Sequence, residues 1–171
     1  MTRIRSRAAA LLVGAAAVLA LTGCSPTVDV PKAAGGDAKG CAAIVVRLPS
    51  TVDGAAQRQV DQQGTAAWGD GNPPSVVLRC GVTPPGPTTA TCTPVDGVDF
   101  LIRAVGRQQY VVTTFGRTPA TQIDLDQGRV DSGTVLPPIA DAIAGAIPHA
   151  TGHCTVSGTS GSTSPTPSPT P

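Results

Sequence analysis

Four cysteines, spread from residue 41 to residue 154, constrain the fold of this chain more than any other feature of its sequence. They are Cys41, Cys80, Cys92 and Cys154. An even number of cysteines in a small domain outside the cytoplasm indicates two disulfides, and four cysteines can pair in three ways. We favour Cys80–Cys92, which would close a local loop between two strands, and Cys41–Cys154, which would tie the first helix to the end of the last.

A zinc site and a reactive thiol compete with this interpretation. No Cys-x-x-Cys pair occurs in the sequence, so the ligand spacing typical of structural zinc sites is missing. Large apolar side chains are also scarce, and small domains with thin cores are commonly stabilised by disulfides. In the chain-entropy model, a bridge that closes a loop on the order of 100 residues stabilises the fold by roughly 4–5 kcal/mol.

The N-terminus indicates the compartment on which the disulfide argument depends. Three arginines in the first seven residues precede an apolar run over residues 8–21, which is too short to span a bilayer comfortably. The run ends in Leu21-Thr22-Gly23-Cys24, the pattern of a lipoprotein signal. We expect residues 1–23 to be a signal peptide and Cys24 to carry a lipid that anchors the chain at the extracytoplasmic face of the cell membrane. An ordinary signal peptide cleaved elsewhere and an uncleaved anchor are the alternatives.

Composition divides the remaining chain into three parts. Residues 24–40 are rich in Ala, Gly, Pro and Asp, which predicts a flexible tether. Residues 156–171 are almost entirely Gly, Ser, Thr and Pro, so they cannot bury a core and are expected to be a disordered tail. The hydroxyl groups of this tail either carry O-linked sugars or stay bare. The globular domain is therefore expected over residues 41–155.

The hydrophobic pattern of residues 41–155 predicts an α+β domain. We expect a small antiparallel sheet of about four strands, flanked by an N-terminal and a C-terminal helix and stapled by two disulfides. The first helix should stop at Pro49, and Pro137-Pro138 should open the last one, whose apolar side repeats at Ile139, Ile143 and Ile147. The expected strands cover residues 75–82, 98–104, 109–115 and 120–125. Residues 50–67 show no clear period.

The charge balance narrows the class of partner. Without the three N-terminal arginines, nine basic residues face eleven acidic ones, all of them Asp. No run of basic residues survives removal of the signal peptide, whereas nucleic-acid-binding domains carry a basic patch or stripe. We therefore expect no nucleic-acid partner.

Few residues are candidates for ligand binding, and each has a structural alternative. Trp68 and Asp70 belong to a turn-rich loop where an indole ring could stack on a sugar or a peptide, but the only Trp of a domain is also a natural core anchor. Arg79, Arg103 and Arg117 would form an anion site if they shared one face of the sheet. The alternative is that these arginines pair with aspartates across the sheet. The aspartates in question are Asp96, Asp99 and Asp124.

Signatures of metal binding and catalysis are weak. His149 and His153 are four residues apart, but Pro148 and Gly152 argue against a helix there, and a metal needs further ligands, so we expect no metal site. No Gly-x-Ser-x-Gly elbow, phosphate loop or His-Glu-x-x-His motif occurs. A glycosidase-like carboxylate pair stays open, with Asp as the only acid available. We expect no cofactor.

Several segments together resemble one protein family. They are Cys41-Ala42-Ala43, residues 65–70, residues 77–82, Cys92, residues 96–100 and Thr114-Phe115-Gly116-Arg117. The more specific blocks are Ala67-Trp68-Gly69-Asp70 and Leu78-Arg79-Cys80-Gly81. In this order they resemble the actinobacterial secreted proteins grouped as domain of unknown function 3515. The resemblance implies an exported or membrane-associated protein and supplies no catalytic residue.

These observations favour a cell-envelope lipoprotein that binds or scaffolds another component without catalysis. Its expected partners are the membrane, through the lipid anchor, and an envelope protein or a cell-wall component. A small envelope enzyme that acts on cell-wall material through aspartates near Trp68 is one alternative. A lipoprotein that binds a small ligand is the other.

Overall fold

A computed structural model describes residues 26–154. One eight-stranded antiparallel sheet dominates this part of the chain, with the strand order β1-β2-β3-β4-β8-β7-β6-β5. The strands are β1 (Thr51–Val52), β2 (Ala55–Arg58), β3 (Thr65–Trp68), β4 (Val76–Val82), β5 (Cys92–Val95), β6 (Val98–Gly106), β7 (Gln109–Phe115) and β8 (Ala120–Asp126). The helices are α1 (Lys39–Val45) and α2 (Ser132–Ala146). The expected signal peptide, Cys24 and the tail over 156–171 lie outside the described residues.

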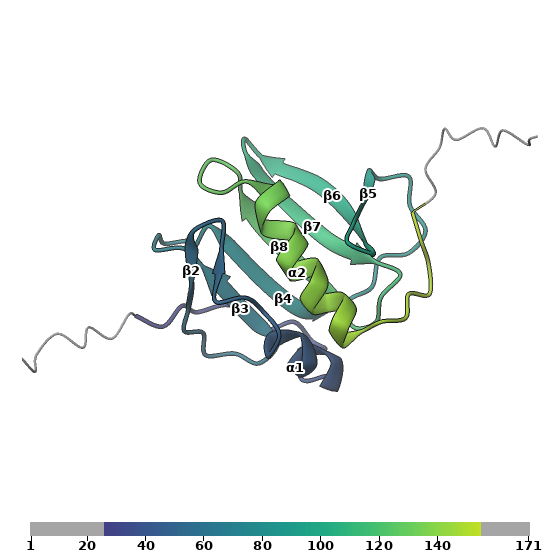
Figure 1. Cartoon of the computed structure of the whole chain (residues 1–171), viewed down its shortest axis with the longest axis horizontal. Helices are drawn as coiled ribbons and strands as arrows, with labels where there is room; N and C mark the ends of the chain where they lie inside the picture. The colour runs from purple at the N-terminus through teal and green to yellow at the C-terminus, as the bar shows by residue number, and fades with distance from the viewer. Residues whose placement is uncertain (1–25, 155–171) are drawn as a thin grey trace, which may run out of the picture.

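The last strand joins two halves of the sheet. Strands β1 to β4 form one meander and β5 to β8 another, and β8 lies between β4 and β7. Helix α2 then crosses one face of the sheet, and α1 lies near one end of α2 (Figure 1). Within residues 26–154, neither helix is long and apolar enough to cross a membrane.

The expected four-stranded sheet between two helices is wrong. The four expected strands exist as β4, β6, β7 and β8, but four further strands extend the sheet to eight and make the fold mainly β. The additional strands β1, β2, β3 and β5 are only two to four residues long. Such short segments cannot display a hydrophobic period, and β3 is buried at all four positions.

Helix α2 begins before the two prolines that were expected to open it. Asp131 caps the helix, because its carboxylate accepts a hydrogen bond from the backbone N–H of Thr134 at 3.0 Å. Pro137 and Pro138 follow in the second turn, so the backbone hydrogen bonds that they remove are close to the helix start. The start signal in this sequence is therefore the Asp cap and not the proline pair.

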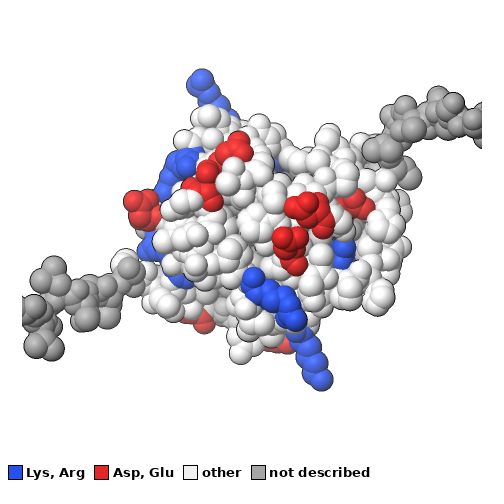
Figure 2. Space-filling view, in the orientation of Figure 1, with Lys and Arg blue, Asp and Glu red and all other residues white. Residues whose placement is uncertain are grey.

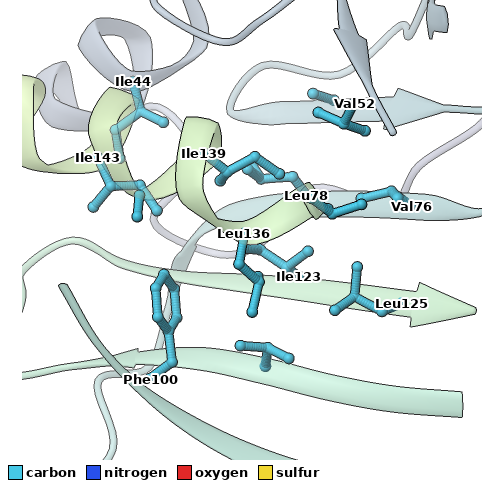
Figure 3. Packing of buried hydrophobic residues seen from close by; sticks show 14 of the residues in the cluster. Ile44, Val52, Val76, Leu78, Phe100, Ile123, Leu125, Leu136, Ile139 and Ile143 are labelled. Carbon is cyan, nitrogen blue, oxygen red and sulfur yellow. The ribbon is translucent and has the colours of Figure 1, made fainter. Parts of the chain in front are cut away.

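The hydrophobic core fills the space between α2 and the sheet. Leu136 and Ile139 of α2 lie beside the side chains of β4 and β8, among them Leu78 and Ile123, and Ile143 lies next to α1 (Figure 3). These five side chains are at most 5 % exposed. Burying an aliphatic side chain of this size contributes roughly 1.5–3 kcal/mol, so the contact between α2 and the two central strands is a main source of stability.

The segment expected to be a flexible tether lies against the other face of the sheet. Val28 forms a β-bridge with Val60, Val30 is 2 % exposed, and the N–H of Gly35 donates to the carbonyl of Gly81 at 3.0 Å. In Figure 1 this purple segment passes behind the sheet, on the side away from α2. Within the described residues, the segment before residue 41 is therefore packed on the domain and is not a free tether.

Backbone-to-backbone contact fixes this segment on β4. Gly81 has a φ of +86°, and a Cβ at this position would lie 2.1 Å from the carbonyl carbon of Gly35. No side chain fits such a gap, and the positive φ independently disfavours any residue other than glycine. Both conditions restrict position 81 to glycine as long as the N-terminal segment packs against β4.

We expect Gly81→Ala to lower the free energy of unfolding by more than the roughly 1–3 kcal/mol typical of a non-glycine residue at positive φ, because the N-terminal segment must also move. Gly54→Ala is the matched control: its φ is +74°, but a Cβ there has nothing within 4 Å. Urea unfolding of the two variants gives the comparison. Equal losses would show that the contact with Gly35 contributes nothing.

The disulfides use all four expected cysteines, but the favoured pairing is wrong. Cys41 pairs with Cys80 (Cα–Cα 5.4 Å) and Cys92 pairs with Cys154 (Cα–Cα 5.7 Å). The expected Cys80–Cys92 bridge fails because β4 and β5 are close in sequence but separated by β8, β7 and β6 in the sheet. One bridge instead ties α1 to β4, and the other ties the edge strand β5 to the C-terminal segment.

Peptide mapping without reduction should recover the pairs Cys41–Cys80 and Cys92–Cys154. No Lys or Arg lies between Cys80 and Cys92, so the digest needs a protease that cuts at other residues within 81–91. Replacing both Cys41 and Cys80 by Ala should cost about 4 kcal/mol in the chain-entropy model, given their separation of 39 residues. A recovered Cys80–Cys92 peptide would contradict the sheet order.

Candidate functional site

Two neighbouring hollows lie where the N-terminal segment, β2 and the loop over residues 69–75 meet. The larger hollow has a volume of about 830 Å³ and the smaller one about 600 Å³. Pro26, Arg58 and Asp70 line both of them. The larger hollow extends along β2 toward Arg129, and the smaller hollow extends over the outer face of the sheet toward Arg79.

Arg58 lines both hollows and binds backbone carbonyls of the two segments that lie between them. Its Nη1 donates to the carbonyl of Gly71 at 2.9 Å, and its Nη2 donates to the carbonyl of Pro26 at 3.0 Å. A guanidinium group can bind two carbonyls at once because its donors form a rigid planar fork. One side chain of β2 therefore fixes both the loop and the first described residue of the N-terminal segment.

Arg129 holds the same loop from the other side. Its Nη1 donates to the carbonyl of Pro73 at 2.9 Å, and its Nη2 lies 3.7 Å from a carboxylate oxygen of the solvent-exposed Asp70. Gly71 gives the guanidinium its space, since a Cβ there would lie 2.2 Å from Nη2 of Arg129. The loop is thus clamped between two arginines, with the Asp70 carboxylate pointing into solvent.

Arg79 and Arg103 share the outer face of the sheet, as the anion-site hypothesis requires. Arg79 lies opposite Gln122, Gln122 opposite Thr113, and Thr113 opposite Leu101, which is two residues before Arg103. However, Arg79 forms an ion pair with Asp124, which is the alternative that the sequence left open. Arg103 is exposed two positions along β6 and lines neither hollow.

Trp68 is a core residue. Its side chain is fully buried, and its Nε1 donates to the carbonyl of Pro49 at 3.0 Å. The indole therefore offers no face to a ligand, although Asp70, two residues further on, lies at the surface of both hollows. The Trp anchors the start of the loop that the two arginines clamp.

Arg117 lines neither hollow and lies in a cluster beside the C-terminal end of α2. It donates hydrogen bonds to the carbonyls of Ile147 and Gly97. Burial lowers the pKa of Arg117 below its ordinary value, and the nearby Asp99 carboxylate opposes this shift. Asp99 also accepts a hydrogen bond from the N–H of Cys154 at 3.0 Å and lies 3.1 Å from Nδ1 of His153. This cluster fixes the segment after α2.

The structure shows no metal centre in the part of the chain that it describes. Over residues 26–154, no three His, Cys, Asp or Glu side chains come together closely enough to hold an ion. His149 and His153 are both exposed, and His153 is paired with Asp99. The face of the molecule that carries α2 shows Lys, Arg and Asp in small separate groups on a largely uncharged surface (Figure 2).

The hollows combine guanidinium donors with exposed carboxylate and carbonyl oxygens, which suits a polar ligand that carries both an anionic group and hydrogen-bond donors. Arg58 and Arg129 are the two residues that sequence reasoning missed. Neither belongs to a motif: Arg58 lies in a stretch without a period, and Arg129 lies in the turn between β8 and α2. The sequence gave a signal for this site only at the turn-rich residues 69–74 and at Arg79 with its possible partner Asp124, which line the smaller hollow.

We expect Arg58→Ala to lower the free energy of unfolding by about 1–2 kcal/mol, because the carbonyls of Gly71 and Pro26 lose their charged hydrogen-bond donor. The local effect should be larger: hydrogen exchange of the amides over residues 69–75 should accelerate more than exchange in the core strands. Arg103→Ala is the control, because the structure gives Arg103 no hydrogen bond to another described residue, and its cost should stay within about 0.5 kcal/mol. Unchanged exchange in the loop would show that Arg58 does not hold it.

Comparison with known proteins assigns most of the chain to a family. A family profile described as a protein of unknown function (DUF3515) matches residues 7–151. No curated protein and no solved structure matches the chain significantly.

Proposed function

The chain belongs to the DUF3515 family, whose function is unknown, and we propose that it is a non-catalytic lipoprotein of an actinobacterial cell envelope. In this proposal the lipid on Cys24 holds the domain on the outer face of the membrane, and the two hollows around Arg58 bind or scaffold another envelope component. The observation that carries the proposal is the lipoprotein signal Leu21-Thr22-Gly23-Cys24, which follows three arginines and an apolar run over residues 8–21.

The energetics of lipid anchoring support this assignment. Each buried CH₂ group of an acyl chain contributes roughly 0.8 kcal/mol, and one chain alone gives only reversible binding, whereas two or more give stable attachment. A cysteine modified with a diacylglycerol meets this requirement without a membrane-spanning helix. The two disulfides fit the same compartment, because structural disulfides persist in oxidising surroundings.

The state of the charged side chains supports binding over catalysis. Arg58, Arg79 and Arg129 each bind a carbonyl or a carboxylate of the protein, so they shape the hollows. Asp70 is exposed and lies beside Arg129, whereas catalytic carboxylates are commonly buried or placed against a second carboxylate. A preformed, polar, clamped surface of this kind is suited to recognition.

Replacing Cys24 by Ser should move the protein from the membrane fraction to the soluble fraction of its native host, because the thiol that accepts the lipid is lost. Ser25→Ala, which leaves the thiol in place, is the matched control and should stay in the membrane fraction. Intact mass spectrometry of the extracted protein should show a diacylglycerol on Cys24 and no residues before it. Retention of the Cys24→Ser protein in membranes, or an unmodified Cys24, would contradict the proposal.

A further inference from the structure

We infer that the free edge of β6, residues 103–106, is a docking surface that takes up an extended acidic segment of another protein as an additional antiparallel strand. These residues line neither hollow, so the inference goes beyond the proposed function and does not depend on a lipid at Cys24. It follows from where β5 stops, from the backbone groups that this leaves without a partner, and from the charge of the side chains beside them.

The first step is the difference in length between β6 and its outer neighbour. Strand β5 pairs with only the first four residues of β6, and the last contact is the hydrogen bond from the N–H of Ile102 to the carbonyl of Thr91 at 3.0 Å. Strand β6 continues past β5 to Gly106, along the upper edge of the sheet in Figure 1. All four residues of the free edge are solvent-exposed, so no other part of the described chain covers them.

The second step is the direction of the backbone groups. Residues along an antiparallel strand bond alternately to one neighbouring strand and to the other. Ile102 directs its N–H toward β5, so Ala104, two residues further on, directs its N–H and C=O to the same side, beyond the start of β5. The same alternation places Pro94, which has no N–H, opposite Asp99 at a position where β5 and β6 exchange no bond. Ala104 therefore offers one donor and one acceptor to an added strand.

The third step is the charge beside these groups. Arg103 and Arg107 are exposed, and none of the four ion pairs within residues 26–154 involves either of them. Val105, between the two arginines, is 51 % exposed. A strand added along the free edge would cover part of this apolar side chain and meet both guanidinium groups. Carboxylates in the added strand are therefore favoured, because guanidinium groups bind them through charge-assisted hydrogen bonds.

The alternation of side chains determines where these carboxylates belong. The partner residue opposite Ala104 exchanges two backbone hydrogen bonds with it, and its side chain lies on the same face of the sheet as that of Ala104. The partner residues before and after it point to the opposite face, which carries Arg103. A segment with acidic side chains on both sides of one apolar residue fits this arrangement. Addition of a strand to a sheet edge, with backbone bonds for affinity and alternate side chains for specificity, is a known mode of peptide recognition.

A second copy of this chain fits the free edge less well. If two edges paired about a twofold axis at Ala104, the two Arg103 side chains would be diagonal neighbours on one face, about 7–8 Å apart. No acidic residue occurs over residues 101–109 to offset this repulsion. Exposed charges, and a bulge such as the one between Ala104 and Gly106, also protect sheet edges from aggregation. They do not oppose pairing with an acidic strand.

The test is an NMR titration of the full chain, purified in a neutral detergent, with the peptide acetyl-Thr-Glu-Val-Glu-Thr-amide. We expect the largest shifts at the backbone amides of residues 103–107. Hydrogen exchange of the Ala104 N–H should slow about tenfold when about nine-tenths of the protein is bound, because only the free state then exchanges. The N–H of Ile102, already bonded to Thr91, is the internal reference and should keep its exchange rate.

Two control peptides separate strand addition from charge attraction. Methylation of the backbone nitrogen of the central Val keeps both carboxylates but removes the N–H that would donate to the carbonyl of Ala104, so exchange at Ala104 should no longer slow. Replacement of both Glu by Lys should lower the affinity at least about fivefold, because attraction at two exposed pairs becomes repulsion. Equal binding of either control peptide would overturn the inference.

Variants of the chain test the same surface. Ala104→Pro removes the outward N–H and no bond to β7, a position where sheets tolerate proline, so we expect an intact sheet that no longer binds the peptide. Ala104→Thr keeps the N–H and is the matched control. If the proline disturbs the amides of β7, the double variant Arg103→Glu with Arg107→Glu replaces it and should prefer the lysine peptide.

Two further outcomes would reject an acidic partner. Absence of shifts over residues 103–107 in the titration would show that the free edge does not take up the peptide. Shifts at Ala104 that depend on protein concentration without any peptide would show that a second copy of the chain occupies the edge.

Discussion

The antiparallel pairing of β4 with β8 is the interaction on which the rest of this structure depends. In the sheet described over residues 26–154 it joins the two four-stranded meanders, and it runs from Val76 opposite Leu125 to Val82 opposite Ala120. Helix α2 packs on the apolar sides of these two strands, and Leu78 and Ile123 belong to this contact. Because side chains alternate along a strand, the same pairing presents Arg79 and Asp124 on the opposite face. One register therefore places the core on one side of the sheet and the charged wall of the smaller hollow on the other.

That opposite face is covered by the N-terminal segment, and its position determines the candidate site. Gly35 approaches Gly81 so closely that only backbone fits between segment and strand, and the Cys41–Cys80 bridge locks the next turn of chain onto the same strand. Upstream of this contact, Arg58 binds Pro26. Residues 26–31 line the smaller hollow, so a segment that resembles a linker in composition is part of the candidate site.

The sequence carried more information about the fold than a search for hydrophobic periods extracts. Asp53-Gly54 and Asp96-Gly97 both have positive φ at each residue, the geometry of a tight hairpin turn, and they connect β1 to β2 and β5 to β6. An Asp-Gly pair between candidate strands is a recognised hairpin signal. The hairpins β1–β2 and β5–β6 could therefore have been predicted from local turn chemistry, whereas the pairs β2–β3 and β3–β4 could not. The sequence did not predict β3 as a strand because β3 is buried on both faces and its side chains show no alternation of polar and apolar residues.

By itself, the sequence determined the features that depend on neighbouring residues: the four longer strands, the hairpin between β6 and β7, the apolar side of α2 and the participation of four cysteines in disulfides. Only the tertiary structure decided which cysteines pair, that Trp68 is buried, and that Arg58 and Arg129 clamp one loop. Disulfide partners follow strand order in the sheet and not distance along the chain, and the two arginines are far apart in sequence and belong to no motif. Local patterns specify elements because propensity and period act over a few residues, whereas a binding surface is set by contacts between segments that meet only after the sheet has assembled.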